Sequence, residues 1–170
     1  MPSFEDDFHR LYTERFGPLF KYLDRLCGDA ELASDTAQEA FIRLYRRGEV
    51  PDQPGAWLVA VAHNLLRDQR RRATRHLRLL EEKAGRIPMA SPAVDPAAGL
   101  DADERIRLVR AALERLSPRY REALLLRHAG YSYREIAAAL DLAEGSVGTV
   151  LLRAGHLFRH AFKEMHGAPE

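Results

Sequence analysis

The chain has 170 residues, which is enough for one medium-sized domain or two small ones. Its 46% hydrophobic and 30% charged residues are typical of an ordinary folded protein and argue against a disordered or membrane-embedded chain. The 26 Lys and Arg nearly balance the 25 Asp and Glu, so a nucleic-acid-binding surface has to arise from local segregation of charge. An acidic N-terminus without a secretory signal, and the lack of any run of 18 apolar residues, predict a cytoplasmic protein with no membrane insertion.

Apolar residues at helical spacing predict three helices in the first half of the chain. The first covers residues 4–27, where Pro18 should bend the helix or split it, and the second runs from about Leu32 to Arg47. The loop 48–55, which contains two prolines, precedes a third helix that ends in a run of arginines without any acid between Gln69 and Leu80. Such a density of cations exceeds what helix capping needs and favours a surface that follows nucleic-acid phosphates.

The second half is predicted to hold four helices behind a linker. Residues 85–99 contain three prolines among small residues and show no periodicity, which indicates an extended linker. A helix is expected from Ile106 to about Ser117. Ser117 and Pro118 then suit the N-cap and first position of another helix, which Gly130 ends.

The last two predicted helices meet across a tight break. Ser132 and Glu135 form a capping-box pattern at the start of the first of them, and residues 141–145 leave room only for a turn before the second. This is the arrangement of a helix-turn-helix, in which the second helix reads DNA, although a helical hairpin within a core fits the same pattern. Strand-like alternation occurs nowhere in the sequence, so the predicted fold class is all-α.

Signatures of catalysis and of metal binding are missing from the sequence. It contains no glycine-rich phosphate loop, no nucleophile elbow and no His–carboxylate pair at catalytic spacing, so we expect no enzyme activity and no cofactor. Cys27 is the single cysteine, which excludes a disulfide and a thiolate zinc cluster. His156 and His160 are four residues apart, with His166 beyond, but no third ligand is in register and we expect no metal site. His63 faces either DNA or the core.

In this order, the parts resemble the extracytoplasmic-function group of bacterial RNA polymerase sigma factors, the small two-domain members of the sigma-70 family. The resemblance is carried by residues 35–47 (DTAQEAFIRLYRR), 56–72 (AWLVAVAHNLLRDQRRR) and 116–153. It implies two small helical domains joined by a flexible linker. A three-helix sigma domain 2 is expected at residues 1–80, the linker at 81–103, and a four-helix sigma domain 4 with the helix-turn-helix at 104–166.

The resemblance also implies a function, partners and site residues. The chain would be an alternative sigma factor that binds the beta and beta-prime subunits of core RNA polymerase, directs initiation at promoter DNA and is itself held by an anti-sigma factor. The implied polymerase-docking residues are Asp35, Gln38, Glu39 and Arg43. Those implied near the minus-ten element are Asn64, Arg67, Arg70, Arg71, Arg72 and Arg75. Those implied at the minus-thirty-five element are Arg119, Tyr133, Arg134, Ser146, Thr149 and Arg153.

The recognition helix departs from the family pattern at two positions. Members commonly place Lys or Arg where this chain has Gly148 and Val150. Three explanations stay open: readout through DNA shape and backbone amides, compensation by phosphate contacts of Arg119 or Arg134, or weakened DNA binding by the second domain. Two other functions also remain, a free-standing helix-turn-helix regulator and a sigma-like interaction protein with impaired minus-thirty-five readout.

Overall fold

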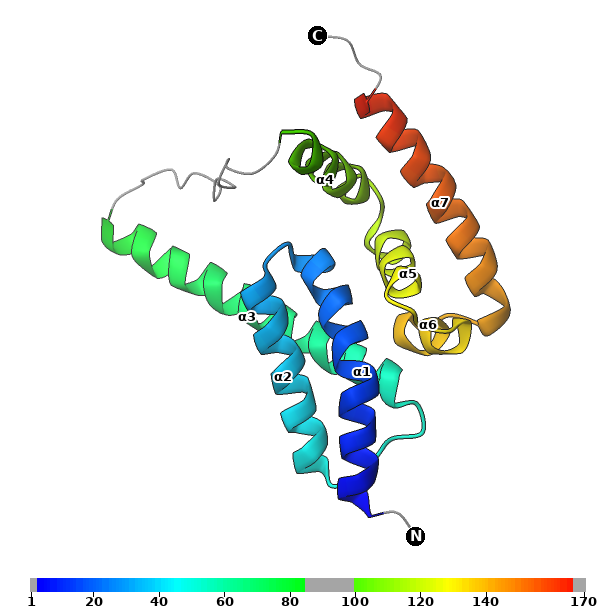
Figure 1. Cartoon of the computed structure of the whole chain (residues 1–170). Helices are drawn as coiled ribbons and strands as arrows, with labels where there is room; N and C mark the ends of the chain where they lie inside the picture. Colours follow the sequence, from blue (N-terminus) through cyan, green and yellow to red (C-terminus); the bar gives the residue numbers. More distant parts are fainter. Residues whose placement is uncertain (1–2, 85–99, 167–170) are drawn as a thin grey trace.

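The computed structural model describes residues 3–84 and 100–166, and within these ranges all regular secondary structure is helical (Figure 1). The helices of the described ranges are α1 Phe4–Cys27, α2 Ala30–Arg47, α3 Pro54–Ala84, α4 Leu100–Glu114, α5 Pro118–His128, α6 Tyr133–Leu140 and α7 Glu144–His166. The all-α prediction is confirmed. The predicted linker 85–99 lies outside the described residues, and α4 begins six residues earlier than Ile106, where the apolar periodicity starts.

Helices α1 and α2 form an antiparallel pair whose ends are fixed by local hydrogen bonds. The amide of Asp6 donates to the Ser3 hydroxyl (3.2 Å) while the Ser3 amide donates to the Asp6 carboxylate (3.1 Å), which makes a capping box at the start of α1. Asp29 caps α2 by accepting from the Leu32 amide (3.0 Å). Pro18 lies inside α1, which remains a single helix rather than two.

Helix α3 has two parts with different surroundings. Its first part packs on α1 and α2 through Leu58, Val59 and Ala62, which are fully buried, and through Leu66. Every described side chain from Arg67 to Leu79 is exposed, because this part of α3 extends beyond the other helices (Figure 1). A helix surrounded by solvent on all sides needs no apolar stripe, which agrees with its arginine-rich sequence.

In the second half of the chain, local hydrogen bonds fix the end of α4 and the start of α6. The Arg121 guanidinium donates to the carbonyls of Leu113 (3.0 Å) and Glu114 (3.1 Å), in the last turn of α4, where carbonyls lack partners within the helix. At the start of α6, Ser132 and Glu135 form the predicted capping box. Ser117 occupies the N-cap position of α5, but its side chain makes no capping hydrogen bond.

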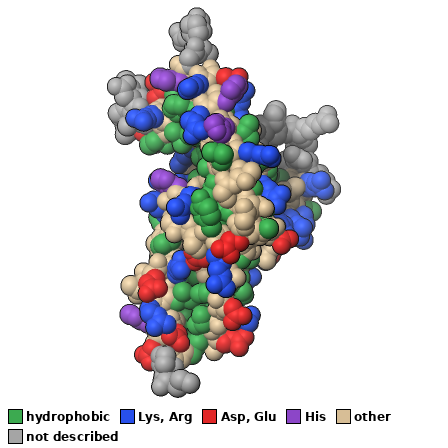
Figure 2. Space-filling view, turned by 90° about the vertical axis from the view of Figure 1, so that its right-hand side faces the viewer, with side chains coloured by type: hydrophobic (Ala, Val, Ile, Leu, Met, Phe, Trp, Pro, Cys, Tyr) green, Lys and Arg blue, Asp and Glu red, His purple; other side chains and the backbone are tan. Residues whose placement is uncertain are grey.

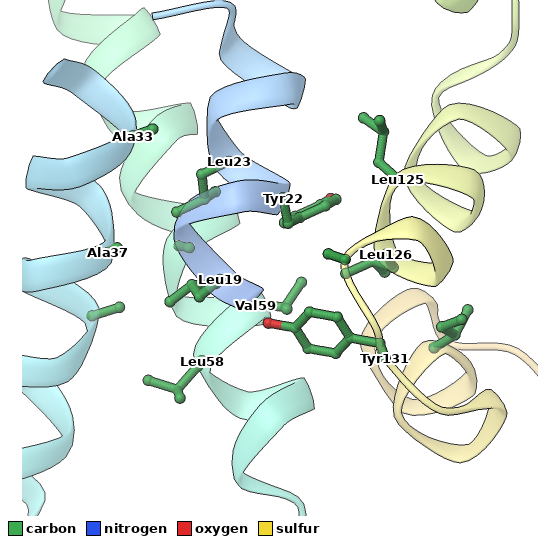
Figure 3. Packing of buried hydrophobic residues seen from close by; sticks show 14 of the residues in the cluster. Leu19, Tyr22, Leu23, Ala33, Ala37, Leu58, Val59, Leu125, Leu126 and Tyr131 are labelled. Atoms are coloured by element: carbon green, nitrogen blue, oxygen red, sulfur yellow. The ribbon is translucent and has the colours of Figure 1, made fainter. Parts of the chain in front are cut away.

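The two halves pack against each other through one continuous apolar core. Tyr22 and Val59, from α1 and α3, face Leu126 and Tyr131, from the end of α5 and the segment before α6, and Leu19 of α1 belongs to the same core (Figure 3). All five side chains are at most 1% exposed. Since these residues belong to both halves, burial holds the halves in a closed arrangement in which α1 contacts α5 and α3 contacts α6.

Ionic and steric contacts accompany this apolar interface. Arg15 of α1 lies 2.7 Å from the Glu135 carboxylate of α6, and both side chains are mostly shielded from solvent. The same carboxylate approaches Gly55 at the start of α3 so closely that a Cβ there would lie 2.5 Å from a glutamate oxygen. A Cβ at position 55 would therefore require the Glu135 carboxylate to shift from its place beside Arg15.

Not every side chain at the helical apolar spacing is buried. Tyr45 is 53% exposed, because its ring lies at the edge of the α1–α2 pair against Phe8. Leu157 is 48% exposed, whereas Ala154 and Ala161 of the same helix are buried.

Candidate polymerase and nucleic-acid interfaces

The four predicted polymerase-docking residues share one side of α2. Asp35, Gln38, Glu39 and Arg43 are spaced by three, one and four residues, so they lie along one face of the helix. Arg43 pairs with Glu39 at 3.2 Å, and Gln38 donates to the Ser34 hydroxyl at 3.1 Å. Asp35, Gln38 and Arg43 are exposed and Glu39 is half-buried, while the opposite face of α2 packs in the core. This polar face is available for a protein partner.

The predicted minus-ten residues do not form a single row. On a helix with 3.6 residues per turn, Asn64, Arg67, Arg71 and Arg75 lie along one face, which we call the arginine stripe. Arg70 and Arg72 fall on the two flanks of this stripe. All six side chains are exposed, so they differ in the side of α3 from which they project and not in burial.

His63 is turned toward the interior instead of toward a ligand. The Tyr22 hydroxyl lies 2.7 Å from its Nε2, and a neutral His63 can accept a hydrogen bond from that hydroxyl there. Burial, reinforced by the nearby Arg67 guanidinium, holds the pKa of His63 below its ordinary value. Of the two orientations that the sequence leaves open, the structure therefore selects the core.

Helices α6 and α7 form the predicted helix-turn-helix. The turn residue Asp141 has φ +52°, a left-handed conformation that Asp tolerates better than most residues, and the Leu142 amide donates to the Ala137 carbonyl at 2.8 Å. Val147 is fully buried and anchors α7 on α6. The predicted minus-thirty-five residues all lie on the surface of α5, α6 and α7, and they are Arg119, Tyr133, Arg134, Ser146, Thr149 and Arg153.

The two positions that depart from the family pattern have different surroundings. Val150 is partly buried and packs against the core, so its side chain is directed inward. A Cβ on Gly148 would lie 3.7 Å from the ring of Tyr133, in ordinary van der Waals contact. The Tyr133 ring also lies near the Arg127 guanidinium, 5.4 Å from the ring centroid. Tyr133 thus fills the space beside Gly148.

The histidines of α7 have partners other than a metal ion. His156 Nδ1 lies 3.2 Å from the Arg159 guanidinium, and His160 Nδ1 lies 3.6 Å from the Glu164 carboxylate. Among the described residues, no three His, Cys, Asp or Glu side chains are placed to hold a metal ion together. No helix in the described ranges is both long and apolar enough to cross a membrane.

Sequence reasoning missed one surface at the junction of the two halves. A groove runs between the end of α1 and helices α4, α5 and α7, with an apolar lining that includes Ile106, Val109 and Phe158. Its rim is mainly basic: Arg25, Arg105, Arg110, Arg127 and His128 flank it, with Asp24 as the one acid among its lining residues. Ile106 is 52% exposed there. Its exposure could not be predicted, because the groove depends on how the halves pack.

Comparison with known proteins identifies both halves. Residues 11–76 match Sigma-70 region 2, and residues 106–154 match Sigma-70 region 4. The ECF RNA polymerase sigma factor SigL of Mycobacterium tuberculosis is 34% identical over 162 residues, which cover 91% of this chain and 88% of the relative. SigE of Mycolicibacterium smegmatis, another ECF RNA polymerase sigma factor, is 33% identical over 94% of this chain and 61% of its own length.

Among solved structures, the sigma factor RpoE of Bartonella quintana, determined in complex with the anti-sigma factor NepR, has the same fold. It superposes with a TM-score of 0.64 and 24% identity, covering 92% of this chain and 97% of that one. The chain therefore belongs to the extracytoplasmic-function RNA polymerase sigma factors of the sigma-70 family. This family is not an enzyme class.

Proposed function

We propose that the chain is an alternative sigma factor, without enzyme activity of its own, which binds core RNA polymerase in the cytoplasm and directs initiation at a specific set of promoters. The observation that carries the proposal is the presence of regions 2 and 4, in that order, over most of the chain. A free-standing helix-turn-helix regulator would need neither the polar face of α2 nor the arginine stripe.

Each domain has a separate role in the proposal. Residues 1–80 dock on polymerase through Asp35, Gln38, Glu39 and Arg43, and approach the minus-ten element with Asn64 and the α3 arginines. Both roles are supported by the positions of these side chains, which lie outside the core along defined faces of α2 and α3. A single-stranded DNA backbone is recognised by cations along a groove, a requirement that the arginines of α3 meet. Residues 104–166 dock α7 in the major groove of the minus-thirty-five element.

Promoter engagement requires the closed arrangement to open. The minus-ten and minus-thirty-five elements are separated by about 25 base pairs, or about 85 Å of B-form DNA. Asn64 lies only about 14 Å along α3 from Gly55, which contacts α6, and α6 in turn packs on α7. The two reading surfaces are therefore on the order of 40 Å apart, which is too close for both elements. Binding to core polymerase would supply the energy for separation.

The sharpest test of the docking role changes Asp35 and Glu39 together. Asp35→Ala with Glu39→Ala should weaken binding to purified core polymerase at least tenfold, because one exposed and one half-buried carboxylate are lost from the same face. Glu5→Ala with Glu31→Ala, two exposed carboxylates at the starts of α1 and α2, is the matched control. Normal binding by the first double variant would show that this face of α2 is not the docking surface.

An anti-sigma factor is the third proposed partner, and the groove between the halves supports it. An amphipathic helix with an acidic polar face would complement both the apolar lining and the basic rim. Ile106→Glu should then weaken capture of the chain by such a factor while leaving core binding unchanged. Equal capture of Ile106→Glu and the unaltered chain would exclude this groove.

A further inference from the structure

The surface that the second domain presents to DNA contains an apolar part that the family pattern does not explain. Leu152 is 62% exposed and Tyr133 is 44% exposed, although both are large and apolar or aromatic. Leu152 lies one helical turn beyond Gly148, on the same side of α7, and Gly148 is the residue against which the Tyr133 ring lies. Tyr133, Gly148 and Leu152 thus form a connected strip, here called the apolar strip.

The position of Tyr133 is fixed by its neighbours. The Arg127 guanidinium lies 5.4 Å from the ring centroid and is itself oriented by a hydrogen bond to the Tyr131 carbonyl at 3.4 Å. On the other side, the missing side chain of Gly148 leaves space that a longer residue would take from the ring. A long cationic side chain at position 148 would therefore start in contact with the Tyr133 ring and compete with it for the same surface.

The apolar strip adjoins polar groups suited to DNA. Thr149 and Arg153 lie next to Gly148 and Leu152 along α7, and both are exposed. Figure 2, which views the molecule from the side of α7, shows hydrophobic side chains between Lys and Arg side chains on the middle of this face. A surface with cations around an apolar centre can bind a DNA groove without cationic base contacts.

We propose that Tyr133 and Leu152 are specificity-determining residues for the minus-thirty-five element, and that they select thymine through its 5-methyl group. In the major groove the thymine methyl is the apolar group that distinguishes base pairs, so it is the natural partner of an exposed leucine and a ring edge. In this proposal the apolar contacts of Tyr133 and Leu152 take the place of the cations absent at positions 148 and 150, so the second domain still reads the DNA sequence. This inference rests on the proposed sigma function.

The test uses the full chain in a complex with core polymerase and a promoter library with a randomised minus-thirty-five region. The complex with the unaltered chain should enrich thymine at one or two positions. Tyr133→Ala and Leu152→Ala should each lose part of that enrichment while the other positions stay the same. Tyr133→Phe should retain it, because the ring is kept. Both sites are exposed, so truncation leaves no buried cavity.

A second readout removes only the methyl group. Deoxyuridine in place of an enriched thymine should weaken complex formation about fourfold with the unaltered chain, as expected for one lost methyl contact. It should not weaken complex formation with the double variant Tyr133→Ala, Leu152→Ala.

Gly148→Arg should displace the Tyr133 ring and change the selected sequence, whereas Gly148→Ala, whose Cβ fits at 3.7 Å from the ring, should not. Equal binding to thymine and uracil, or unchanged selection by the double variant in an active complex, would overturn the inference alone. Failure of the unaltered chain to bind core polymerase would overturn the proposed function, and the inference with it.

Discussion

At the scale of single residues, Tyr22 and His63 link α1 to the packed part of α3. The hydroxyl–imidazole contact of 2.7 Å is partly buried, and Tyr22 belongs to the core that joins the domains. Because burial and Arg67 lower the pKa of His63 in the folded chain, the neutral imidazole is the form that folding favours. The contribution of His63 to stability is therefore complete above the ordinary pKa of 6.5 and is lost as the pH falls through the lower folded-state value.

Because the pKa of His63 is lowered by folding, the stability of the chain should fall with decreasing pH in a way that depends on this residue. His63→Gln keeps an acceptor near the Tyr22 hydroxyl but cannot be protonated, so its melting temperature should fall less than that of the unaltered chain between pH 7.5 and pH 5. Thermal unfolding followed by circular dichroism measures the difference. His9→Gln, at an exposed position of α1, is the control and should retain the full pH dependence. Parallel curves for His63→Gln and the unaltered chain would contradict the buried, neutral imidazole.

At the scale of helices, the N-caps of α5 and α6 provide a matched pair. Ser132 makes a capping box with Glu135, while Ser117 has no side-chain capping hydrogen bond. Ser132→Ala should lower the free energy of unfolding by about 1 kcal/mol, and Ser117→Ala should change it by much less. Urea denaturation measures both. Equal losses of unfolding free energy in the two variants would mean that the capping hydrogen bonds of Ser132 do not stabilise the fold.

If the arginine stripe faces the DNA, its arginines should contact more phosphates than the arginines on its flanks. Arg67→Ala with Arg71→Ala, two members of the stripe, should reduce the salt dependence of open-complex formation by a log–log slope of about 0.7 for each lost phosphate contact. Arg70→Ala with Arg72→Ala removes the same charge from the flanks and should reduce the slope less. Open-complex formation at several salt concentrations gives both slopes. Identical slopes for the two double variants would show that net charge, not the stripe, determines binding.

Helix positions and caps were largely predictable from sequence, because they depend on local chemistry. The Ser132–Glu135 capping box, the start of α3 near Gly55 and the end of α5 near Gly130 follow from residue types within a few positions of each other. The placement of the predicted site residues on exposed surfaces also agrees with the structure, whereas their roles remain predictions. The direction of His63 could not be read from its neighbours in sequence.

What the sequence did not reveal was how the two halves meet. Helix α5 buries Leu125 and Leu126 together, which a one-sided amphipathic pattern does not predict. The reason is that α5 packs on α7 on one side and on α1 on the other. Periodicity indicates that a residue is buried, but it does not say against which part of the chain. For the same reason, the contact of Glu135 with Arg15 was missed.

At the scale of the whole molecule, the Arg15–Glu135 pair is expected to help to hold the domains closed. Arg15→Ala leaves the shielded Glu135 carboxylate without its cation at the interface, and a loss of 1 to 2 kcal/mol would raise the open population about 5- to 30-fold. Small-angle X-ray scattering should show a larger radius of gyration, and core polymerase should bind more tightly. Arg10→Ala, which breaks an ion pair within α1, is the control. An unchanged scattering curve for Arg15→Ala would show that this pair does not hold the domains together.

The central claim is that this chain directs promoter-specific initiation. Run-off transcription with purified bacterial core polymerase, on the DNA upstream of the gene for this chain, tests the claim most directly, because such factors often drive their own promoters. We predict a discrete transcript that requires the chain and is lost with Asp35→Ala, Glu39→Ala. Binding to core polymerase without any transcript from this DNA or from a genomic promoter library would contradict the claim, and would favour a sigma-like interaction protein instead.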